Sequence, residues 1–200
     1  LFGYNNIETT FPLIPADTRH LDRKIDLRSL TKVLMTGLGF SEAINYSFIS
    51  KNSCDRLELP PDDPKRKMVD ILNPISEDQT VMRTSLIPGL LETMKFNISV
   101  QNKNLKLFEI GNVFFHTGQN DHQPDEIEML AGLWTGTNIN STWSRKEINC
   151  DFYDIKGVVE ELLKNLGIEK TTFTRIPAEF CLYTRPGFSA RILDEDGLIG

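Results

Sequence analysis

Five polar side chains in the second half of the chain are of the types that bind metals or transfer protons. His116, Asp121 and His122 share one loop, and imidazole and carboxylate groups are common metal ligands. Their spacing matches no closed metal site, so the composition of a polar loop explains them better. Asp151 and Asp154 could act as a carboxylate pair, but the helix dipole alone favours carboxylates in the first turn of a helix. We therefore predict neither a metal site nor an acid–base pair here.

Two further charged residues have an open role. Glu109 stands between Phe108 and Ile110 in a strand pattern, where its carboxylate could be an active-site acid. A charged residue that alternates with apolar ones usually faces solvent or a partner surface, and we expect this of Glu109. Arg83 could bind a phosphate or a partner chain, because a guanidinium makes planar, bidentate contacts. A structural ion pair is the other open possibility for Arg83.

Signals for nucleotide or nucleic-acid binding are weak. The pattern Gly37-x-Gly39 has Glu42 where a dinucleotide fingerprint needs its third glycine, and it closes a helix instead of opening one. With 22 basic against 28 acidic residues and a net charge of −6, the chain as a whole would repel a polyphosphate. Any RNA contact must be local. Two basic clusters could provide it, although such clusters are more often solvated surface: Lys65, Arg66 and Lys67, and the group Arg19, Arg23, Lys24 and Arg28.

Composition indicates an ordinary globular protein. Two hundred residues, 40% of them hydrophobic and 25% charged, are enough for one large domain with a well-developed core. The three cysteines, Cys54, Cys150 and Cys181, lack the paired spacing of a zinc site or a disulfide framework, and we interpret them as ordinary thiols in a reducing compartment. Since no apolar run reaches the roughly 18 residues of a membrane span, we expect a soluble cytoplasmic protein.

Three long helices are expected to position these residues. Apolar residues recur at helical spacing over 26–38, and Gly39 ends that run. A second helix begins near Pro88 and includes apolar positions to residue 98, with Ser85 as a possible cap. The third, over 151–166, has one continuous apolar face and acidic residues at its start. A short helix through Leu57, capped by Ser50, is also predicted.

Alternating apolar residues predict strands at 43–49, 68–72, 105–110 with 113–115, 128–134 and 188–193. The strands at 105–115 and 128–134 are expected to be antiparallel neighbours, and a turn at 194–197 leads to a return strand from Leu198. This order predicts an α+β fold, an antiparallel β-sheet flanked by helices. We divide the chain into a lead-in segment from a preceding domain, residues 1–24, and a core, residues 25–200, that is truncated at the C-terminus.

Seven phrases of the sequence are similar to the β subunit of bacterial-type phenylalanyl-tRNA synthetase. They are GYNNI at 3–7, GFSEAINYSF at 39–48, NPIS at 73–76, MRTSLIPGLL at 82–91, LFEIGNVF at 107–114, DFYDIKG at 151–157 and RPGFSA at 185–190. Because they follow in order over nearly the whole chain, the chain resembles the C-terminal class II synthetase-like core domain of that subunit. The resemblance implies a non-catalytic core that pairs with a catalytic α subunit in an (αβ)2 enzyme, which attaches phenylalanine to tRNA(Phe).

The resemblance also implies what the site has lost. In class II aminoacyl-tRNA synthetases, the strand that 107–115 resembles ends in an arginine that holds the α-phosphate of ATP, and Phe115 stands at that position here. A phenyl ring cannot supply the fixed cation, so we expect no catalytic and no cofactor-binding residue in this chain. The whole enzyme is implied to use ATP and magnesium. The magnesium ligands of the β subunit would lie upstream of residue 1, so we predict no metal here.

Residues 39–46 resemble the first class II signature, which builds the subunit interface, with Tyr46 in place of its usual proline. We take Gly39, Phe40, Tyr46, Phe48 and Arg83 as candidate residues of the interface with the α subunit. We expect the apolar faces of the first two helices to contribute as well. Two other hypotheses stay open: a tRNA-contacting module that acts through the basic clusters, and a residual amino-acid-activating site.

Overall fold

The computed structural model of the chain describes residues 3, 6–8, 10, 23–117, 123–139, 142–177, 183–185, 187–195 and 197–199. Its elements are α1 (Arg23–Gly37), β1 (Ser41–Glu42), β2 (Phe48–Ile49), α2 (Ser53–Arg56), the 3-10 helix η2 (Pro64–Arg66), β3 (Val81–Met82), α3 (Ile87–Ser99), β4 (Leu105–Phe115), β5 (Asp125–Thr135), β6 (Thr137–Ile139), β7 (Ile148–Asn149), α4 (Phe152–Asn165), β8 (Thr172–Arg175) and β9 (Ala190–Leu193). None of the helices in this described part has the length and apolar character needed to cross a bilayer.

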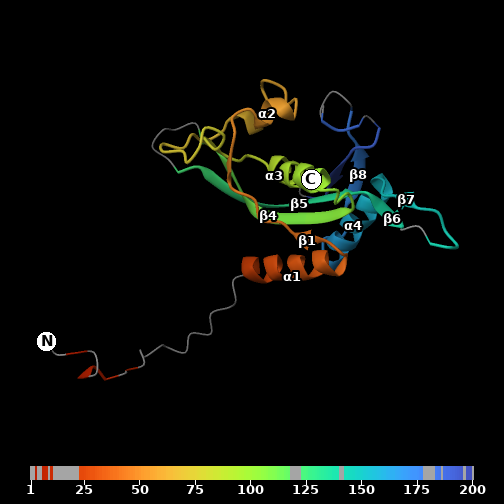
Figure 1. Cartoon of the computed structure of the whole chain (residues 1–200), viewed down its shortest axis with the longest axis horizontal. Helices are drawn as coiled ribbons and strands as arrows, with labels where there is room; N and C mark the ends of the chain where they lie inside the picture. Colours follow the sequence, from red (N-terminus) through yellow and green to blue (C-terminus); the bar gives the residue numbers. More distant parts are fainter. Residues whose placement is uncertain are drawn as a thin grey trace.

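A three-stranded sheet in the order β1-β4-β5 forms the centre of the fold (Figure 1). β4 and β5 pair antiparallel along their whole length, from Leu105 opposite Thr135 to Phe115 opposite Asp125. The short β1 runs parallel to β4 and pairs with residues 107–108. The other described strands form antiparallel pairs, β2 with β3, β6 with β7 and β8 with β9. The predicted α+β fold and the antiparallel pairing of the two long strands are confirmed.

Helices cover both faces of this sheet. In Figure 1, α1 lies on one side of the β4–β5 pair and α3 on the other. Successive side chains of a strand point to opposite faces, so Phe108 and Ile110 share the face that packs on α1 and α4, whereas Glu109 points toward α3. The main core consists of Met35, Phe40, Phe108, Ile110 and Leu162. The result is a layered sheet with a buried charged residue, Glu109, on its α3 face.

Two of the predicted long helices have well-defined ends. At the end of α1, the backbone N–H of Phe40 donates to the carbonyl of Met35 at 3.0 Å, and Gly39 takes the positive φ of 86° that this closure needs. α4 begins with a capping box. The Asp151 carboxylate accepts from N–H groups of the first turn, and Asp154 accepts in return from the N–H of Asp151. The expectations that Gly39 ends the first helix and that acids open the last are confirmed.

The prediction of one strand over 43–49 is wrong. Of this stretch only Phe48–Ile49 form a strand, β2, which pairs with β3, whereas β1, which pairs with β4, ends just before it at Glu42. Residues 43–47 cross from one sheet to the other outside any named strand. They do so because Asn45 turns its side chain to Glu109, so that side-chain hydrogen bonds take the place of a continuing backbone ladder.

The predicted strand at 68–72 is also wrong. It forms only one isolated bridge, between Asp70 and Val81, and the proline-rich stretch before it winds into η2. The return strand expected at the C-terminal end is reduced, in the described residues, to a bridge between Leu193 and Leu198.

The two predicted serine caps are not N-caps. The N-cap of α2 is Asn52 and that of α3 is Leu86, and neither makes a side-chain capping hydrogen bond. The hydroxyls of Ser50 and Ser85 instead accept from backbone N–H groups two residues on, at 3.3 Å in both cases, which closes a local turn before each helix.

Candidate functional site

Phe115, which stands where the resemblance expects an ATP-binding arginine, is the last residue of β4. It is half-buried, follows the buried Phe114 and pairs with Asp125 at the start of β5. A phenyl ring offers a phosphate neither a hydrogen-bond donor nor a charge. The next residue, His116, is exposed, and its backbone N–H donates to the carbonyl of Lys67 at 3.4 Å. The end of β4 itself therefore carries no fixed guanidinium or ammonium group.

A buried ion pair lies under α3. Nη1 of Arg83 donates to Oε1 of Glu109 at 2.5 Å, and the two side chains are only 5% and 4% exposed. Nε of Arg83 also donates to the carbonyl of Asn112 at 2.9 Å. The expectation that Glu109 faces solvent or a partner is wrong, because α3 and residues 43–47 cover its face of the sheet. For Arg83, the structural ion pair is the possibility that is observed.

Asn45 extends this pair into a larger network. Its Nδ2 donates to Oε2 of Glu109 at 2.6 Å, and its backbone N–H donates to Oε1 at 3.4 Å. From the other side, Oγ1 of Thr93 in α3 donates to Oδ1 of Asn45 at 2.7 Å. Gly89 leaves the necessary room, since a Cβ there would lie 3.0 Å from Cβ of Asn45. We refer to Asn45, Arg83, Thr93 and Glu109 as the polar bracket.

The polar bracket is fully satisfied. No buried side-chain nitrogen or oxygen atom in the described part of the chain lacks a hydrogen-bond partner. Buried charges are tolerated when they are paired and when further hydrogen bonds satisfy their remaining atoms. The bracket meets both conditions, and it joins β4, α3 and residues 43–47 through side chains. Its chemistry is therefore that of a structural clamp.

The edge of β4 that β1 leaves uncovered is closed by donors from other parts of the chain. Its outward carbonyls, at residues 108, 110 and 112, accept in turn from the N–H of Ala43 at 2.7 Å, Nη2 of Arg28 at 3.3 Å and Nε of Arg83 at 2.9 Å. Two guanidinium groups thus stand where a pairing strand would lie. Beside them is an open cavity of about 350 Å³, which Lys32 and Glu42 also line as an ion pair at 2.7 Å.

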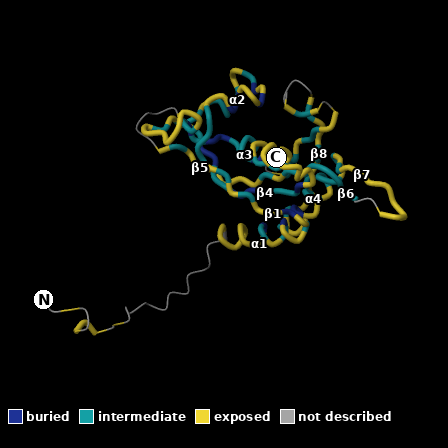
Figure 2. The backbone as a smooth tube through the Cα atoms, viewed as in Figure 1, coloured by how far each residue is buried: buried dark blue, intermediate teal, exposed yellow. Residues whose placement is uncertain are grey.

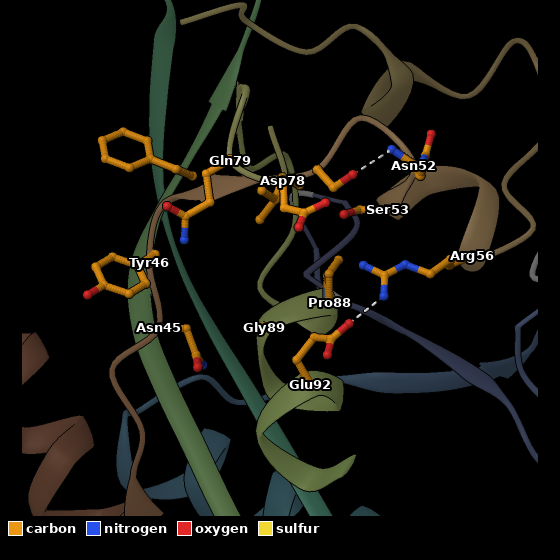
Figure 3. Close-up of a pocket in the computed structure, with 13 residues that line it drawn as sticks. Asn45, Tyr46, Asn52, Ser53, Arg56, Asp78, Gln79, Pro88, Gly89 and Glu92 are labelled. Carbon is orange, nitrogen blue, oxygen red and sulfur yellow. Dashed lines mark hydrogen bonds and ion pairs between the residues drawn. The ribbon is translucent and has the colours of Figure 1, made fainter. Parts of the chain in front are cut away.

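An open groove of about 640 Å³ lies between residues 45–49, α2 and the start of α3 (Figure 3). Tyr46 and Phe48 give it aromatic walls, Asp78 projects from the neighbouring loop, and Arg56 and Glu92 form an ion pair across it. Neither histidine nor cysteine occurs among its described lining residues. The groove thus offers a mixed aromatic and polar surface for binding and no evident nucleophile–base pair.

Apolar side chains stand in solvent next to the polar bracket. Ile44 and Tyr46, which flank Asn45, are 90% and 75% exposed. Ile44 lines the same 350 Å³ cavity as Arg28 and Lys32 of α1, so this segment and α1 are neighbours. Most of α1 is drawn as exposed in Figure 2. We call the exposed apolar residues of the two segments, which face more than one side of α1, the apolar ridge: Ile25, Leu27, Leu30 and Val33 of α1, with Ile44 and Tyr46.

The five candidate interface residues differ in burial. Phe40 lies in the main core and Arg83 in the polar bracket, so both are buried within this chain. Gly39 and Tyr46 are exposed, and Phe48 is half-buried in the groove wall. Gly39, Tyr46 and Phe48 therefore present surface to a partner, whereas Phe40 and Arg83 have little left to present. Contact with an α subunit stays a prediction for all five.

The residues considered for metal binding are only partly described by the structure. Asp121 and His122 lie outside the described residues, and within the described ranges no three His, Cys, Asp or Glu side chains come together as metal ligands. Asp151 and Asp154 form the capping box of α4, and Oδ1 of Asp154 accepts from Asn138 at 2.7 Å. Helix capping thus accounts for this carboxylate pair.

Two arginines considered for RNA contact are committed to the fold. Nη1 of Arg66 donates to Asp55 at 2.7 Å, and its Nε and Nη2 donate to backbone carbonyls of residues 59 and 60. Arg28 forms an ion pair with Glu128 at 2.7 Å in addition to its bond to β4. Arg19 and the side chain of Arg23 lie outside the described residues. The basic clusters are therefore less available to RNA than their sequence suggests.

The cysteines behave as ordinary thiols where the structure describes them. Cys54 and Cys150 are free, and Cys181 lies outside the described residues. Burial raises the pKa of the Cys54 thiol, an effect that the nearby Arg66 guanidinium opposes. Burial likewise raises the pKa of Cys150. Neither thiol therefore has the lowered pKa of a reactive nucleophile.

Sequence reasoning missed three residues of the bracket region. Asn45 sits between Ile44 and Tyr46 in an alternating stretch, and the alternation that exposes its neighbours places Asn45 on the inward side. Gly89 and Thr93 are four residues apart in α3, so they lie on one face of that helix. An inward polar residue opposite a glycine and a threonine is the signal from which the bracket could have been found.

Comparisons of fold point to class II synthetases. Two structures of the pyrrolysyl-tRNA synthetase of Desulfitobacterium hafniense match 91% of this chain and 56% and 59% of their own length, with TM-scores of 0.61 and 0.64. Their sequence identities to this chain are 15% and 16%, so the likeness concerns the fold alone. It confirms the expected class II synthetase-like architecture.

Comparisons of sequence give the family. The phenylalanine–tRNA ligase beta subunit of Syntrophotalea carbinolica is 40% identical over the whole chain, that of Desulfotalea psychrophila 40% over 90% of it, and that of Staphylococcus aureus 35% over all of it. The chain spans about a quarter of the length of these relatives, 24%, 23% and 24% respectively. A model of the phenylalanyl-tRNA synthetase beta chain CLM domain matches residues 7–200. The chain therefore belongs to the family of phenylalanyl-tRNA synthetase beta chain CLM domains.

Proposed function

We propose that this chain is the non-catalytic structural core of the β subunit of phenylalanine–tRNA ligase. In this role it assembles with the catalytic α subunit in an (αβ)2 enzyme and so supports the ATP-dependent attachment of phenylalanine to tRNA(Phe). The observation that carries the proposal is the apolar ridge. It lies on residues 44–46, within the stretch 39–46 that resembles the interface-building signature of class II synthetases, and on α1, the helix before that stretch.

The exposed ridge supports assembly on energetic grounds. Burying one large apolar side chain contributes about 1.5–3 kcal/mol, and association must first overcome several kcal/mol of lost translational and rotational freedom. Burial of several of these six side chains against one partner can meet that cost. Large apolar patches on a soluble chain generally mark an interaction site. An obligate partner subunit with an apolar surface fits this ridge best.

The absence of catalysis in this part of the enzyme is supported by Phe115 and Arg83. Phe115 ends β4 with a neutral ring, and the guanidinium of Arg83 is held by Glu109 in the interior. In this proposal, ATP and magnesium are bound by the α subunit and by parts of the β subunit other than this core. We place the assembled enzyme in the cytoplasm, where thiols such as Cys54 and Cys150 stay reduced.

The test of assembly uses the full-length β subunit co-expressed with the α subunit. The changes Ile44→Asp and Tyr46→Asp place a charge in the apolar ridge, and we expect each to reduce the recovered αβ complex strongly in sedimentation or co-purification. Trp143→Asp is the matched control, because Trp143 is fully exposed but lies in the loop between β6 and β7, away from α1 in Figure 1. Normal assembly of both ridge variants would contradict the proposed interface.

The test of the non-catalytic role is exchange of pyrophosphate into ATP. We expect the β subunit without the α subunit to show no phenylalanine-dependent exchange. Exchange by a well-folded β subunit alone would show that a residual activating site exists.

A further inference from the structure

We propose that the polar bracket positions Ile44 and Tyr46 for the partner subunit, so that Asn45, Arg83 and Glu109 are positioning residues for assembly. The inference rests on the proposed function, because it takes the apolar ridge to be the surface that meets the α subunit. It goes further in assigning a role in partner binding to buried groups that do not touch the partner. The partner surface that fits is apolar and uncharged where it receives Ile44 and Tyr46.

Residues 43–47 need such support because they lie outside any named strand. The segment is tied to the rest of the chain at its two ends by backbone bonds. The N–H of Ala43 donates to the carbonyl of Phe108 at 2.7 Å, and the carbonyl of Ser47 accepts from the N–H of Arg83 at 2.8 Å. Between these tethers, the side chain of Asn45 makes the connection to Glu109 and Thr93. The middle of the segment is thus held by side chains.

The bracket fixes which side chains point outward. Asn45 is directed inward by three hydrogen bonds, two to Glu109 and one from Thr93. In an extended segment, neighbouring side chains point to the opposite side. Ile44 and Tyr46 are accordingly 90% and 75% exposed. A rotation of the segment that buried either of them would break the bonds of Asn45.

Glu109 is well placed to transmit rigidity to this segment. It lies in the middle of β4, flanked by Phe108 and Ile110 of the main core, and its two carboxylate oxygens divide their bonds between Arg83 and Asn45. Arg83 in turn binds both the segment and β4 through its backbone. Its N–H donates to the carbonyl of Ser47 at 2.8 Å, and its carbonyl accepts from the N–H of Phe114 at 2.8 Å. Preorganisation of this kind improves binding by removing the ordering cost at association.

The experiment removes Asn45 from the bracket without touching the ridge. Asn45→Ala, made in the full-length β subunit and co-expressed with the α subunit, leaves Ile44, Tyr46 and the Arg83–Glu109 pair in place. We expect assembly to weaken by at least about tenfold in dissociation constant, measured by dilution of the complex. Amide hydrogen exchange at residues 43–48 should become faster in the same variant, while exchange in α4 stays unchanged.

Two companion variants keep the test sharp. Thr93→Val removes only the bond from Thr93 to Asn45, preserves shape, and should shift both measurements in the same direction by a smaller factor. Asn165→Ala is the matched control, because Asn165 is an exposed asparagine at the end of α4 whose side chain donates to Glu161 of the same helix. We expect it to change neither assembly nor exchange at 43–48.

The outcomes separate this inference from the proposed function. Weaker assembly together with faster exchange at 43–48, in Asn45→Ala and to a lesser degree in Thr93→Val, supports the positioning role. Normal assembly of Asn45→Ala, with or without faster exchange, overturns it while leaving the proposed interface intact. Normal assembly of Ile44→Asp and Tyr46→Asp overturns the proposed interface and this inference with it.

Discussion

Replacing Arg83 by methionine removes the positive half of the buried ion pair while keeping an unbranched side chain in its space. Glu109 would then lose its cationic partner in a site where its side chain is 4% exposed, with only Asn45 left as donor. The carbonyl of Asn112 would also lose its bond from Nε of Arg83 at 2.9 Å. Both effects act on the folded chain, because in the unfolded chain water hydrates all of these groups.

The size of the effect follows from these losses. Breaking a buried ion pair by removing one partner costs about 3–5 kcal/mol, and a neutral hydrogen bond contributes about 1 kcal/mol net. We therefore expect Arg83→Met to lower the free energy of unfolding by about 3–5 kcal/mol. Glu109→Gln in the Arg83→Met background removes the stranded charge. The double variant should therefore lose less than the sum of the two single variants, by about 1–3 kcal/mol.

Urea unfolding of the four proteins of this double-mutant cycle measures the effect. Trp134 is a suitable reporter, because its ring packs edge-on against Phe40 of the main core at 6.1 Å, whereas Trp143 is already fully exposed in the folded chain. A loss of less than about 1 kcal/mol for Arg83→Met would place the pair among weak, solvent-screened contacts. Strict additivity of the two single changes would show that the charges do not interact.

Three other predictions concern stability. Gly89→Ala should destabilise the chain in spite of the better helix propensity of alanine, because the new Cβ would lie 3.0 Å from Cβ of Asn45. Gly157→Ala in α4 should instead stabilise the chain by about 0.5–1 kcal/mol, because no atom lies within 4 Å of the new Cβ. Equal effects of the two changes in urea unfolding would show that Asn45 moves aside at no cost. Asp151→Ala should cost about 0.5–2 kcal/mol and loosen the first turn of α4 in hydrogen exchange, and an unchanged first turn would argue against the capping box. Burial raises the pKa of the Cys54 thiol above its usual value, so as the pH rises into the thiol range the unfolded chain loses a proton that the folded chain keeps, and stability should fall. Cys54→Ala should lack this part of the fall in unfolding experiments between pH 7 and pH 10, and an identical fall would assign it to other groups.

The parts of the fold that could be predicted from sequence are those whose pattern is local. α4 carries its apolar face, its opening acids and its closing glycine within one stretch, and the structure reproduces them. β4 and β5 are long enough for their alternation to be unambiguous. Short strands such as β6 and β7 give no such pattern, because two or three residues do not define a period.

The candidate site could be predicted only in part, because its contacts are distant in sequence. Glu109 meets Arg83 from 26 residues away and Asn45 from 64 residues away, and no local period reports such pairs. The alternation around Glu109 correctly predicts that its side chain lies on the opposite face of the sheet from Phe108. What it could not give is the burial of that face by α3. The same reason explains why residues 43–49 look like one strand, although 43–47 only link β1 of one sheet to β2 of another.

The guanidinium groups along β4 have a consequence for the edge of the β-sheet. A bare strand border is a template on which any extended chain can add itself, and it is the usual origin of intermolecular sheets. Here Arg28 and Arg83 already occupy the carbonyl acceptors of residues 110 and 112, so neither acceptor is open to an incoming strand. A single copy can therefore keep exposed apolar residues in water without adding a strand of a second copy along this edge of the β-sheet.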